Sequence, residues 1–350
     1  MVIVQDAQDA CGDADCACVD GAAGQCAGAE EQCGCECCQS APEPAYEFFG
    51  PQAVVNQHPP DLLFYSPVPE TATTLAPGRR NVIARLEWTN LIIRELDSGI
   101  IADYDFETLR PSLTCKWGTP AGEISASLPF IYRSHGILDG PIADWHKFFG
   151  FTNGLRNIFP DQQYRFTIVT REGLVFNDQG DTYGLGDLSL GLKRELFNRG
   201  DGQKAIAVRA GFKAPLGDPD KALGSGNWDA SVGTVWQRQF GARWRGYAAF
   251  DWVFVGKPDW QHVGHQDIFI TNYALEYALR HNLTLTSQFR TQRNPLRIGS
   301  HQADKDAQEL SVGFNHRVRP DLVWSGGFNE DINPETAPDF VINTQLKWEF

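Results

Sequence analysis

The sequence predicts an all-β protein: a transmembrane antiparallel β-barrel of 12–14 strands, with a short helical segment near residues 142–151 and an irregular N-terminal tail. Three observations lead to this prediction. Apolar and polar residues alternate along many segments, short and long connections follow one another in turn, and Trp and Tyr gather near the segment ends. No run of about 18 apolar residues occurs, so strands and not helices are expected to cross the membrane.

The C-terminal residues show the alternation most clearly. One face of the predicted strand is apolar, and the other is mainly polar: Phe340, Ile342, Leu346, Trp348 and Phe350 against Val341, Asn343, Gln345, Lys347 and Glu349. The same period of two recurs around Trp236, with Gln237 on the opposite face. We therefore expect charged residues of both signs to line the lumen, namely Arg245, Asp251, Arg290, Glu309, Arg317, Lys347 and Glu349, which argues against strong ion selectivity.

Thirteen segments qualify as strands, near residues 81–95, 100–117, 122–134, 164–176, 184–197, 204–215, 227–240, 244–256, 266–279, 281–293, 307–318, 321–330 and 339–350. Bacterial single-chain barrels have an even number of strands. Twelve result if one early segment lies outside the wall, and fourteen if residues 100–117 bend into two strands near Pro111. The helical spacing of Ile142, Trp145 and Phe148 predicts the short helix, which we expect to fold into the lumen as a constriction.

The chain divides into three parts by charge and cysteine content. Residues 1–40 form an acidic, Cys-rich head, residues 41–78 a Pro-rich linker, and residues 79–350 the barrel. Residues 1–78 hold twelve acidic residues and no Lys or Arg, and they account for most of the net charge of −14. The remaining residues are nearly neutral, so the chain lacks the basic surface that nucleic acid requires. The apolar groups Tyr46–Phe49 and Leu62–Tyr65 suggest that the linker docks on the barrel or plugs its interior.

The head contains eight of the nine cysteines, at Cys11, Cys16, Cys18, Cys26, Cys33, Cys35, Cys37 and Cys38. Two interpretations of this cluster stay open. In an exported protein the cysteines would form disulfides, with a pairing that the sequence does not reveal. Their close spacing also suits thiolate ligation of Cu or Zn. Either form of cross-linking would give shape to a segment that is too acidic to build an apolar core.

Two stretches carry a resemblance to a known family. GILDGPIADWHKFFGFTNGLRN at residues 136–157 is the better marker, and YGLGDLSLGLKRELF at residues 183–197 is less specific. On these stretches, residues 79–350 resemble an uncharacterised Gram-negative outer-membrane β-barrel family, a domain of unknown function, whereas the Cys-rich head departs from it. The terminal strand, with Trp348 and Phe350, is similar to the signal that the barrel assembly machinery reads in outer-membrane proteins.

These features predict a non-enzymatic protein of the bacterial outer membrane, since no nucleophile, base and orienting acid stand at a recognisable spacing. It would pass small solutes in the manner of a porin, or anchor an assembly that uses the Cys-rich head. Outer-membrane lipid and the barrel assembly machinery are the expected partners. The even strand number places the N-terminal tail in the periplasm, where a periplasmic protein is a further partner. The alternative is a soluble β-sandwich binding module with a disulfide-rich or metal-binding head.

Overall fold

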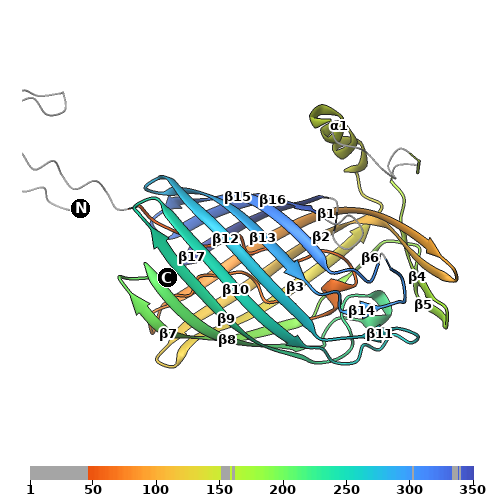
Figure 1. Ribbon diagram of the computed structural model, residues 1–350, viewed down its shortest axis with the longest axis horizontal. Coiled ribbons are helices and arrows are strands. Elements are labelled where there is room, and N and C mark those ends of the chain that lie inside the picture. Colours follow the sequence, from red (N-terminus) through yellow and green to blue (C-terminus); the bar gives the residue numbers. More distant parts are fainter. Residues whose placement is uncertain (1–45, 151–157, 160–161, 302, 333–337, 339) are drawn as a thin grey trace, which may run out of the picture. The chain divides into compact units, whose positions relative to one another are not determined.

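A computed structural model describes residues 46–350, apart from 151–157, 160–161, 302, 333–337 and 339 (Figure 1). One α-helix, two 3-10 turns and seventeen strands make up the described chain. In order they are η2 (Asp61–Leu63), β1 (Arg80–Asp97), β2 (Ile100–Thr119), β3 (Gly122–Ser134), α1 (Asp139–Phe149), β4 (Arg165–Thr170), β5 (Gly173–Asp178), β6 (Thr182–Leu185), β7 (Leu188–Arg199), β8 (Lys204–Ala214), η4 (Pro219–Lys221), β9 (Asp229–Phe240), β10 (Trp244–Phe254), β11 (Gly264–His265), β12 (Ile268–Arg280), β13 (Leu283–Gln292), β14 (Leu296–Arg297), β15 (Ala307–Arg319), β16 (Leu322–Asp331) and β17 (Phe340–Glu349).

Twelve antiparallel strands close into one barrel, in the order β1, β2, β3, β7, β8, β9, β10, β12, β13, β15, β16 and β17. The last strand pairs with the first, and Phe350 and Arg80 exchange two backbone hydrogen bonds of 2.8 and 3.1 Å at the junction. A closed ring has no free edge and satisfies every strand within the sheet, as a membrane requires. The predicted all-β transmembrane barrel is confirmed, and the soluble β-sandwich alternative is wrong.

The barrel has an even number of strands because one of the thirteen predicted strand segments lies outside its wall. Residues 165–178 form the hairpin β4–β5, which extends the outer part of β2 beyond the ring. The fourteen-strand alternative is wrong because β2 continues through Pro111 as one strand. The ladder between β2 and β3 is interrupted at Arg110 and Pro111, where proline has no N–H to donate.

The two ends of the barrel differ in their connections. Five tight turns join β2–β3, β7–β8, β9–β10, β12–β13 and β15–β16 at one end, which we call the short-turn end. The opposite end, the long-loop end, carries the longer connections and the tight turn at Ser98–Gly99, where Gly99 has a φ of +84°. Positive φ is costly for other residues, so glycine suits this turn.

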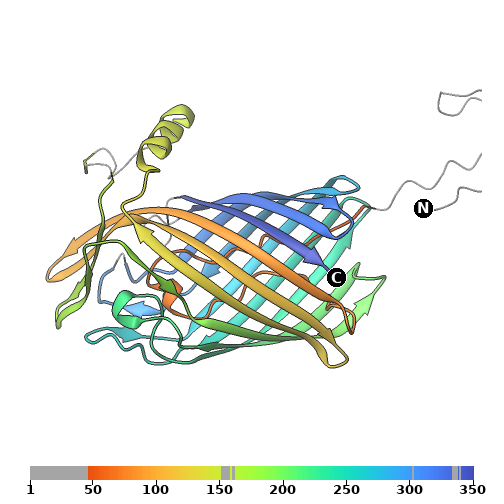
Figure 2. The same ribbon diagram turned by 180° about the vertical axis from the view of Figure 1, so that it is seen from behind.

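Helix α1 lies outside the barrel, beyond the long-loop end (Figures 1 and 2). Its existence was predicted, but the expected constriction of the lumen is wrong. Ile142, near its N-terminus, is buried, whereas Phe148 is 82% exposed. The Phe148 side chain therefore makes little contact with the rest of the described chain. Of the helices in the described ranges, none is long and apolar enough to cross a membrane.

The two faces of the wall have opposite character. Large apolar side chains are exposed on the outer face, among them Val232, Phe250, Leu275, Leu285 and Leu310. Their strand neighbours are buried and polar, including Ser231, Asp251, Glu276, Thr284 and Glu309. A water-soluble protein rarely exposes so much contiguous apolar surface, whereas a lipid-facing barrel requires it.

Candidate functional site

Among the residues that the structure describes, one stretch of chain runs through the lumen. Residues 46–78, which we call the luminal segment, belong to the same compact unit as the barrel, which begins at Tyr46. The segment starts beside the turn at His281, where the Glu47 N–H donates to the His281 carbonyl at 3.0 Å. It crosses to the long-loop end, turns at η2 and returns to the start of β1 (Figures 1 and 2). The sequence-based boundary at residues 78 and 79 therefore does not separate two bodies.

The first arm of the luminal segment is held by one buried carboxylate. Glu276 of β12 accepts hydrogen bonds from the N–H groups of Phe49 and Gly50, at 2.9 and 3.1 Å. Tyr247 and Thr284 also donate to it, at 2.5 and 2.6 Å. Glu276 is fully buried, and these four donors, with Asn315 at 3.4 Å, compensate for the loss of its hydration.

Aromatic residues at the short-turn end pair with arginines of the wall. The Arg243 guanidinium lies 4.9 Å from the centre of the Tyr46 ring, and that of Arg245 lies 4.3 Å from the Phe48 ring. Arg317 lies over Phe49 at 5.4 Å and forms an ion pair of 2.5 Å with Glu47. Cation–π contacts of this kind attach the first residues of the segment to the barrel rim.

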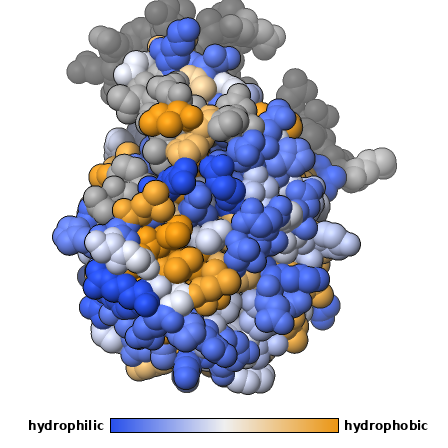
Figure 3. Space-filling view, turned by 90° about the vertical axis from the view of Figure 1, so that its right-hand side faces the viewer, coloured by the Kyte–Doolittle hydropathy of each residue, from blue (hydrophilic) through white to orange (hydrophobic). Residues whose placement is uncertain are grey.

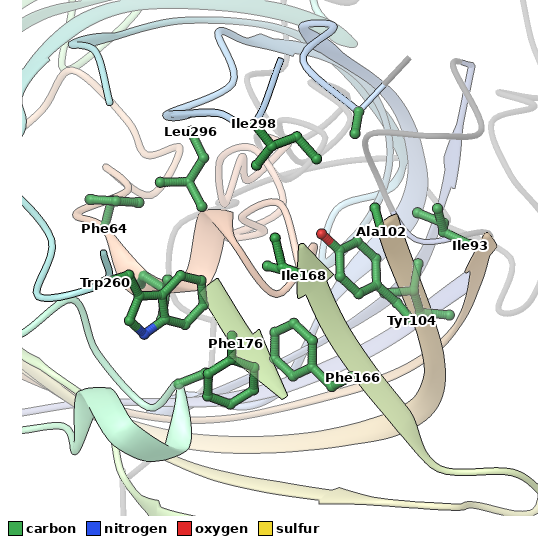
Figure 4. Packing of buried hydrophobic residues seen from close by; sticks show 14 of the residues in the cluster. Phe64, Ile93, Ala102, Tyr104, Phe166, Ile168, Phe176, Trp260, Leu296 and Ile298 are labelled. Carbon is green, nitrogen blue, oxygen red and sulfur yellow. The ribbon is translucent and has the colours of Figure 1, made fainter. Parts of the chain in front are cut away.

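At the long-loop end the segment turns inside an apolar cluster. Leu63 and Phe64 pack with residues of β2, β4, β5 and β14 and with loop residues, among them Tyr104, Phe166, Ile168, Phe176, Trp260, Leu296 and Ile298 (Figure 4). The Phe176 and Trp260 rings stack with centres 5.0 Å apart. Viewed from this end, apolar side chains gather near the middle of the face, with hydrophilic ones around them (Figure 3). The turn of the segment is thus held by burial of apolar surface.

Hydrogen bonds complete the turn. Asp61 accepts from Gln292 of β13 at 2.7 Å, and its other oxygen lies 3.0 Å from Nδ1 of His58. Lys213 of β8 donates to the carbonyl of Leu63 at 2.7 Å and pairs with Asp187, also at 2.7 Å. These polar contacts satisfy groups that burial would otherwise leave without partners.

The returning arm carries a carboxylate that three strands hold at once. Glu70 lies 2.6 Å from Lys116 of β2, 2.9 Å from Lys193 of β7 and 3.1 Å from Arg209 of β8. Arg209 in turn pairs with Asp251 of β10 at 2.6 Å. One charge on the segment therefore connects wall positions that lie far apart in the sequence.

The wall leaves room for the segment where it carries glycine. A Cβ atom built on Gly211 of β8 would lie 2.2 Å from the Tyr65 hydroxyl, and one on Gly118 would lie 2.0 Å from the Ala76 carbonyl. No side chain can approach that closely, so only glycine admits the segment at these two places. The packing of segment and wall is consequently tight at these two places.

A cavity remains beside the luminal segment. It measures about 370 Å³ and lies between the segment and the inner faces of strands that include β1, β2, β3, β7, β8, β16 and β17. Polar and apolar residues both line it, and the polar ones include Arg85, Arg110, Ser112, Ser127 and Gln345. This is a volume for a small molecule and not for a folded domain.

The matching family model is that of a protein of unknown function, DUF3187, and it covers residues 30–350. The chain belongs to this family. The match starts earlier than the resemblance implied, because it includes the linker and Cys33, Cys35, Cys37 and Cys38. The luminal segment is therefore part of the family's shared sequence. No curated protein matches the chain.

Among solved structures, this DUF3187 member is similar to the COG4313 outer membrane channel from Pseudomonas putida F1. The TM-score is 0.59 with 14% sequence identity, over 81% of this chain and all of that chain. It is also similar to the NanC porin (TM-score 0.44, 7% identity, 76% and 98% covered) and to the Ralstonia pickettii toluene transporter TbuX (0.39, 10%, 79% and 90%). At such identities the first likeness establishes the outer-membrane barrel fold alone.

The seven residues predicted to line the lumen fall into separate groups in this DUF3187 barrel. Glu349 pairs with Arg317 at 2.9 Å and with Lys347 at 2.8 Å near the short-turn end. Arg290 and Glu309 are buried and lie 3.9 Å apart, and Arg290 donates to Ser66 at 2.7 Å.

The other two predicted residues have partners elsewhere. Asp251 binds Arg209, and Arg245 donates to Gln239 at 2.9 Å while contacting Phe48. Several of the seven thus face the luminal segment and not an open channel.

Sequence reasoning missed the residues that hold the segment most firmly. Glu276, Lys116, Lys193, Arg209 and Lys213 all stand at polar positions of alternating strands, as the predicted residues do. The alternation was the available signal. It identifies the inward face of a strand, but it does not show which inward charges bind the luminal segment.

The proposed metal or disulfide cysteines lie outside the described residues, as does the whole acidic head. Within the described ranges, no group of three or more His, Cys, Asp or Glu side chains is placed to hold a metal ion. Cys115, on β2, is a free cysteine. Of the predicted assembly signal, Trp348 is half-buried and the Phe350 side chain is 58% exposed.

Proposed function

We propose that this protein is an outer-membrane channel for small solutes, and not an enzyme, which the luminal segment closes in the state described. The observation that carries the proposal is the Glu70 carboxylate, bound by Lys116, Lys193 and Arg209 from three strands. Ion pairs that bind a separable segment to the wall can be exchanged for water when the segment moves. A permanently filled core would be made more simply from apolar residues.

The orientation follows from the connections. Outer-membrane barrels have short periplasmic turns and longer extracellular loops. We place the short-turn end in the periplasm, so the luminal segment begins there, and the Cys-rich head precedes it in the sequence. A periplasmic partner of the head would then be linked directly to the closing segment.

The test is conductance in planar lipid bilayers. The full chain carrying Glu70→Gln and Glu276→Gln should show larger and more frequent conductance steps than the wild type, because both arms of the segment lose their charged anchors. Glu172→Gln with Asp321→Asn is the matched control, since both acids are exposed and contact neither arm. A wild type that already conducts like an unobstructed barrel would contradict closure.

The second candidate is a membrane anchor for an assembly that uses the Cys-rich head. The observation in its favour is that both arms of the segment are bound at several levels of the lumen, by Glu276, Lys213 and Arg209 among others. If both the wild type and the Glu70/Glu276 double variant fold correctly and neither conducts, the membrane-anchor function is favoured over the channel function.

A further inference from the structure

The cavity beside the luminal segment contains a cation without a counter-charge. Seven cations line it: Arg85, Arg110, Lys116, Lys193, Arg209, Lys213 and Lys347. Six of them form ion pairs. Arg85 is the exception, because no carboxylate of the described chain lies within ion-pair distance of it. Its side chain is nevertheless buried, at 8% exposure.

The hydrogen bonding of Arg85 is equally incomplete. Its Nε donates to Gln345 of β17 at 3.4 Å, which is a long hydrogen bond. Within the described ranges this is the one hydrogen bond that the Arg85 side chain makes. A guanidinium has five N–H donors in a planar fork. A buried guanidinium with most donors unused is costly, unless a ligand or water fills the space in front of it.

Two neighbouring groups share this condition. Ser112 of β2 lies opposite Arg85 in the strand register, and its buried hydroxyl has no partner among the described residues. Arg110, two positions along the same face, binds Glu87 at 2.6 Å through Nη1, while its Nε is likewise unpartnered. Arg85, Arg110 and Glu87 together leave one net positive charge. The unused groups are mostly donors, so a complementary ligand would bring acceptors and negative charge.

The surroundings limit the ligand further. Hydroxyl and amide side chains lie along the cavity on both sides of Arg85, including Thr114, Ser125, Ser127, Ser325 and Asn343. Such groups bind hydroxyls as well as they bind water. The volume of about 370 Å³ is at the small end of the range for ligand sites.

We propose that the cavity binds a small hydroxylated organic carboxylate, with Arg85 receiving the carboxylate and Ser112 and the Arg110 Nε completing its contacts. The inference rests on the proposed channel function and specifies its solute class. A bidentate guanidinium–carboxylate contact provides both the charge and the orientation. Because the other cations that line the cavity are paired, Arg85 would be its main anion-binding group.

The experiment measures binding to the full chain in detergent by isothermal titration calorimetry, with gluconate as the probe and uncharged sorbitol as its control. We expect gluconate to bind the wild type and sorbitol to bind at least tenfold more weakly. Arg85→Gln should weaken gluconate binding tenfold or more, since a charged hydrogen-bond pair is lost. Arg319→Gln, at an exposed turn, should leave it unchanged.

Ser112→Ala provides a second variant that does not remove a charge from the wall. It should weaken gluconate binding about threefold, and folding of each variant is checked by the heat-dependent shift in gel migration. The proposal is overturned if the wild type binds no gluconate, if sorbitol binds as well, or if both variants bind like the wild type. If the Glu70/Glu276 double variant conducts but the wild type binds no gluconate, the proposed ligand is wrong and the proposed channel function still holds.

Discussion

Glu276 and Gly50 are 226 positions apart in the sequence, and the carboxylate of one accepts a hydrogen bond from the backbone N–H of the other at 3.1 Å. The contact joins a strand of the wall to the first arm of the luminal segment. Tyr247 and Thr284, which belong to the wall, also donate to this carboxylate and fix its position independently of the segment. Glu276 therefore acts as a rigid receptor for a short stretch of backbone.

Glu276→Gln should loosen the first arm of the segment. Loss of the charge weakens the bonds from Phe49 and Gly50, and hydrogen bonds to charged groups contribute roughly 1.5–3 kcal/mol each. Hydrogen–deuterium exchange of the peptide containing residues 46–52 should then accelerate by about thirtyfold, which corresponds to ~2 kcal/mol. Asp267→Asn, which removes an acceptor at the long-loop end, serves as the control. Unchanged exchange in the Glu276 variant would show that the aromatic contacts hold the arm alone.

Gly211→Val should displace the returning arm without altering the outer surface. The new side chain would occupy the place of the Tyr65 ring, whose atoms lie 2.2–2.4 Å from an ideal Cβ. We expect protease cleavage within residues 60–75 to increase while the barrel stays resistant. Ala210→Val, on the outward face of the same strand, should not change the cleavage pattern. Equal cleavage of both variants would mean that the substitutions disturb strand β8 itself and not the contact between Gly211 and the segment.

Trp236→Arg should impair insertion, because this side chain belongs to the lipid-facing set of β9. Arginine on the lipid face costs about 2–4 kcal/mol near the membrane midplane. Folded yield in lipid vesicles, read from gel migration before and after boiling, is the measurement. Ser189→Arg, which points into the cavity, is the matched control and should fold normally. A Trp236→Arg variant that folds as well as the wild type would mean that the assigned register of β9 is wrong by one residue.

The head cysteines should be cross-linked, by disulfides or by metal. Protein purified without reductant is analysed for free thiols and, in parallel, for bound Cu and Zn. Disulfides predict few free thiols and a head that loosens with reductant, whereas thiolate ligation predicts metal that chelator or acid releases. Eight reactive head thiols without metal would contradict both interpretations. Cys115 provides an internal reference thiol within the barrel.

The strand pattern predicted which face a residue lies on better than what it does there. Gln237 illustrates the difference, since the alternation places it in the lumen, where a substitution would be expected to be tolerated. In the structure its amide oxygen accepts from the Ala72 N–H at 2.8 Å and its amide nitrogen donates to the Gly202 carbonyl at 2.6 Å. Gln237 thus holds the luminal segment. Periodicity is a property of one strand, and this contact depends on a segment from elsewhere in the chain.

The sequence by itself determined the barrel, because a membrane wall imposes a period of two, an apolar outer face and alternating short and long connections on every strand. Those constraints are local and can be detected along the chain. Only the tertiary structure decided that residues 46–78 fill the lumen, that β4 and β5 leave the ring, and that Arg85 faces a cavity without a counter-charge. These features depend on which buried charges and hydrogen-bond donors contact one another across the barrel. Such contacts join residues up to 265 positions apart in the sequence.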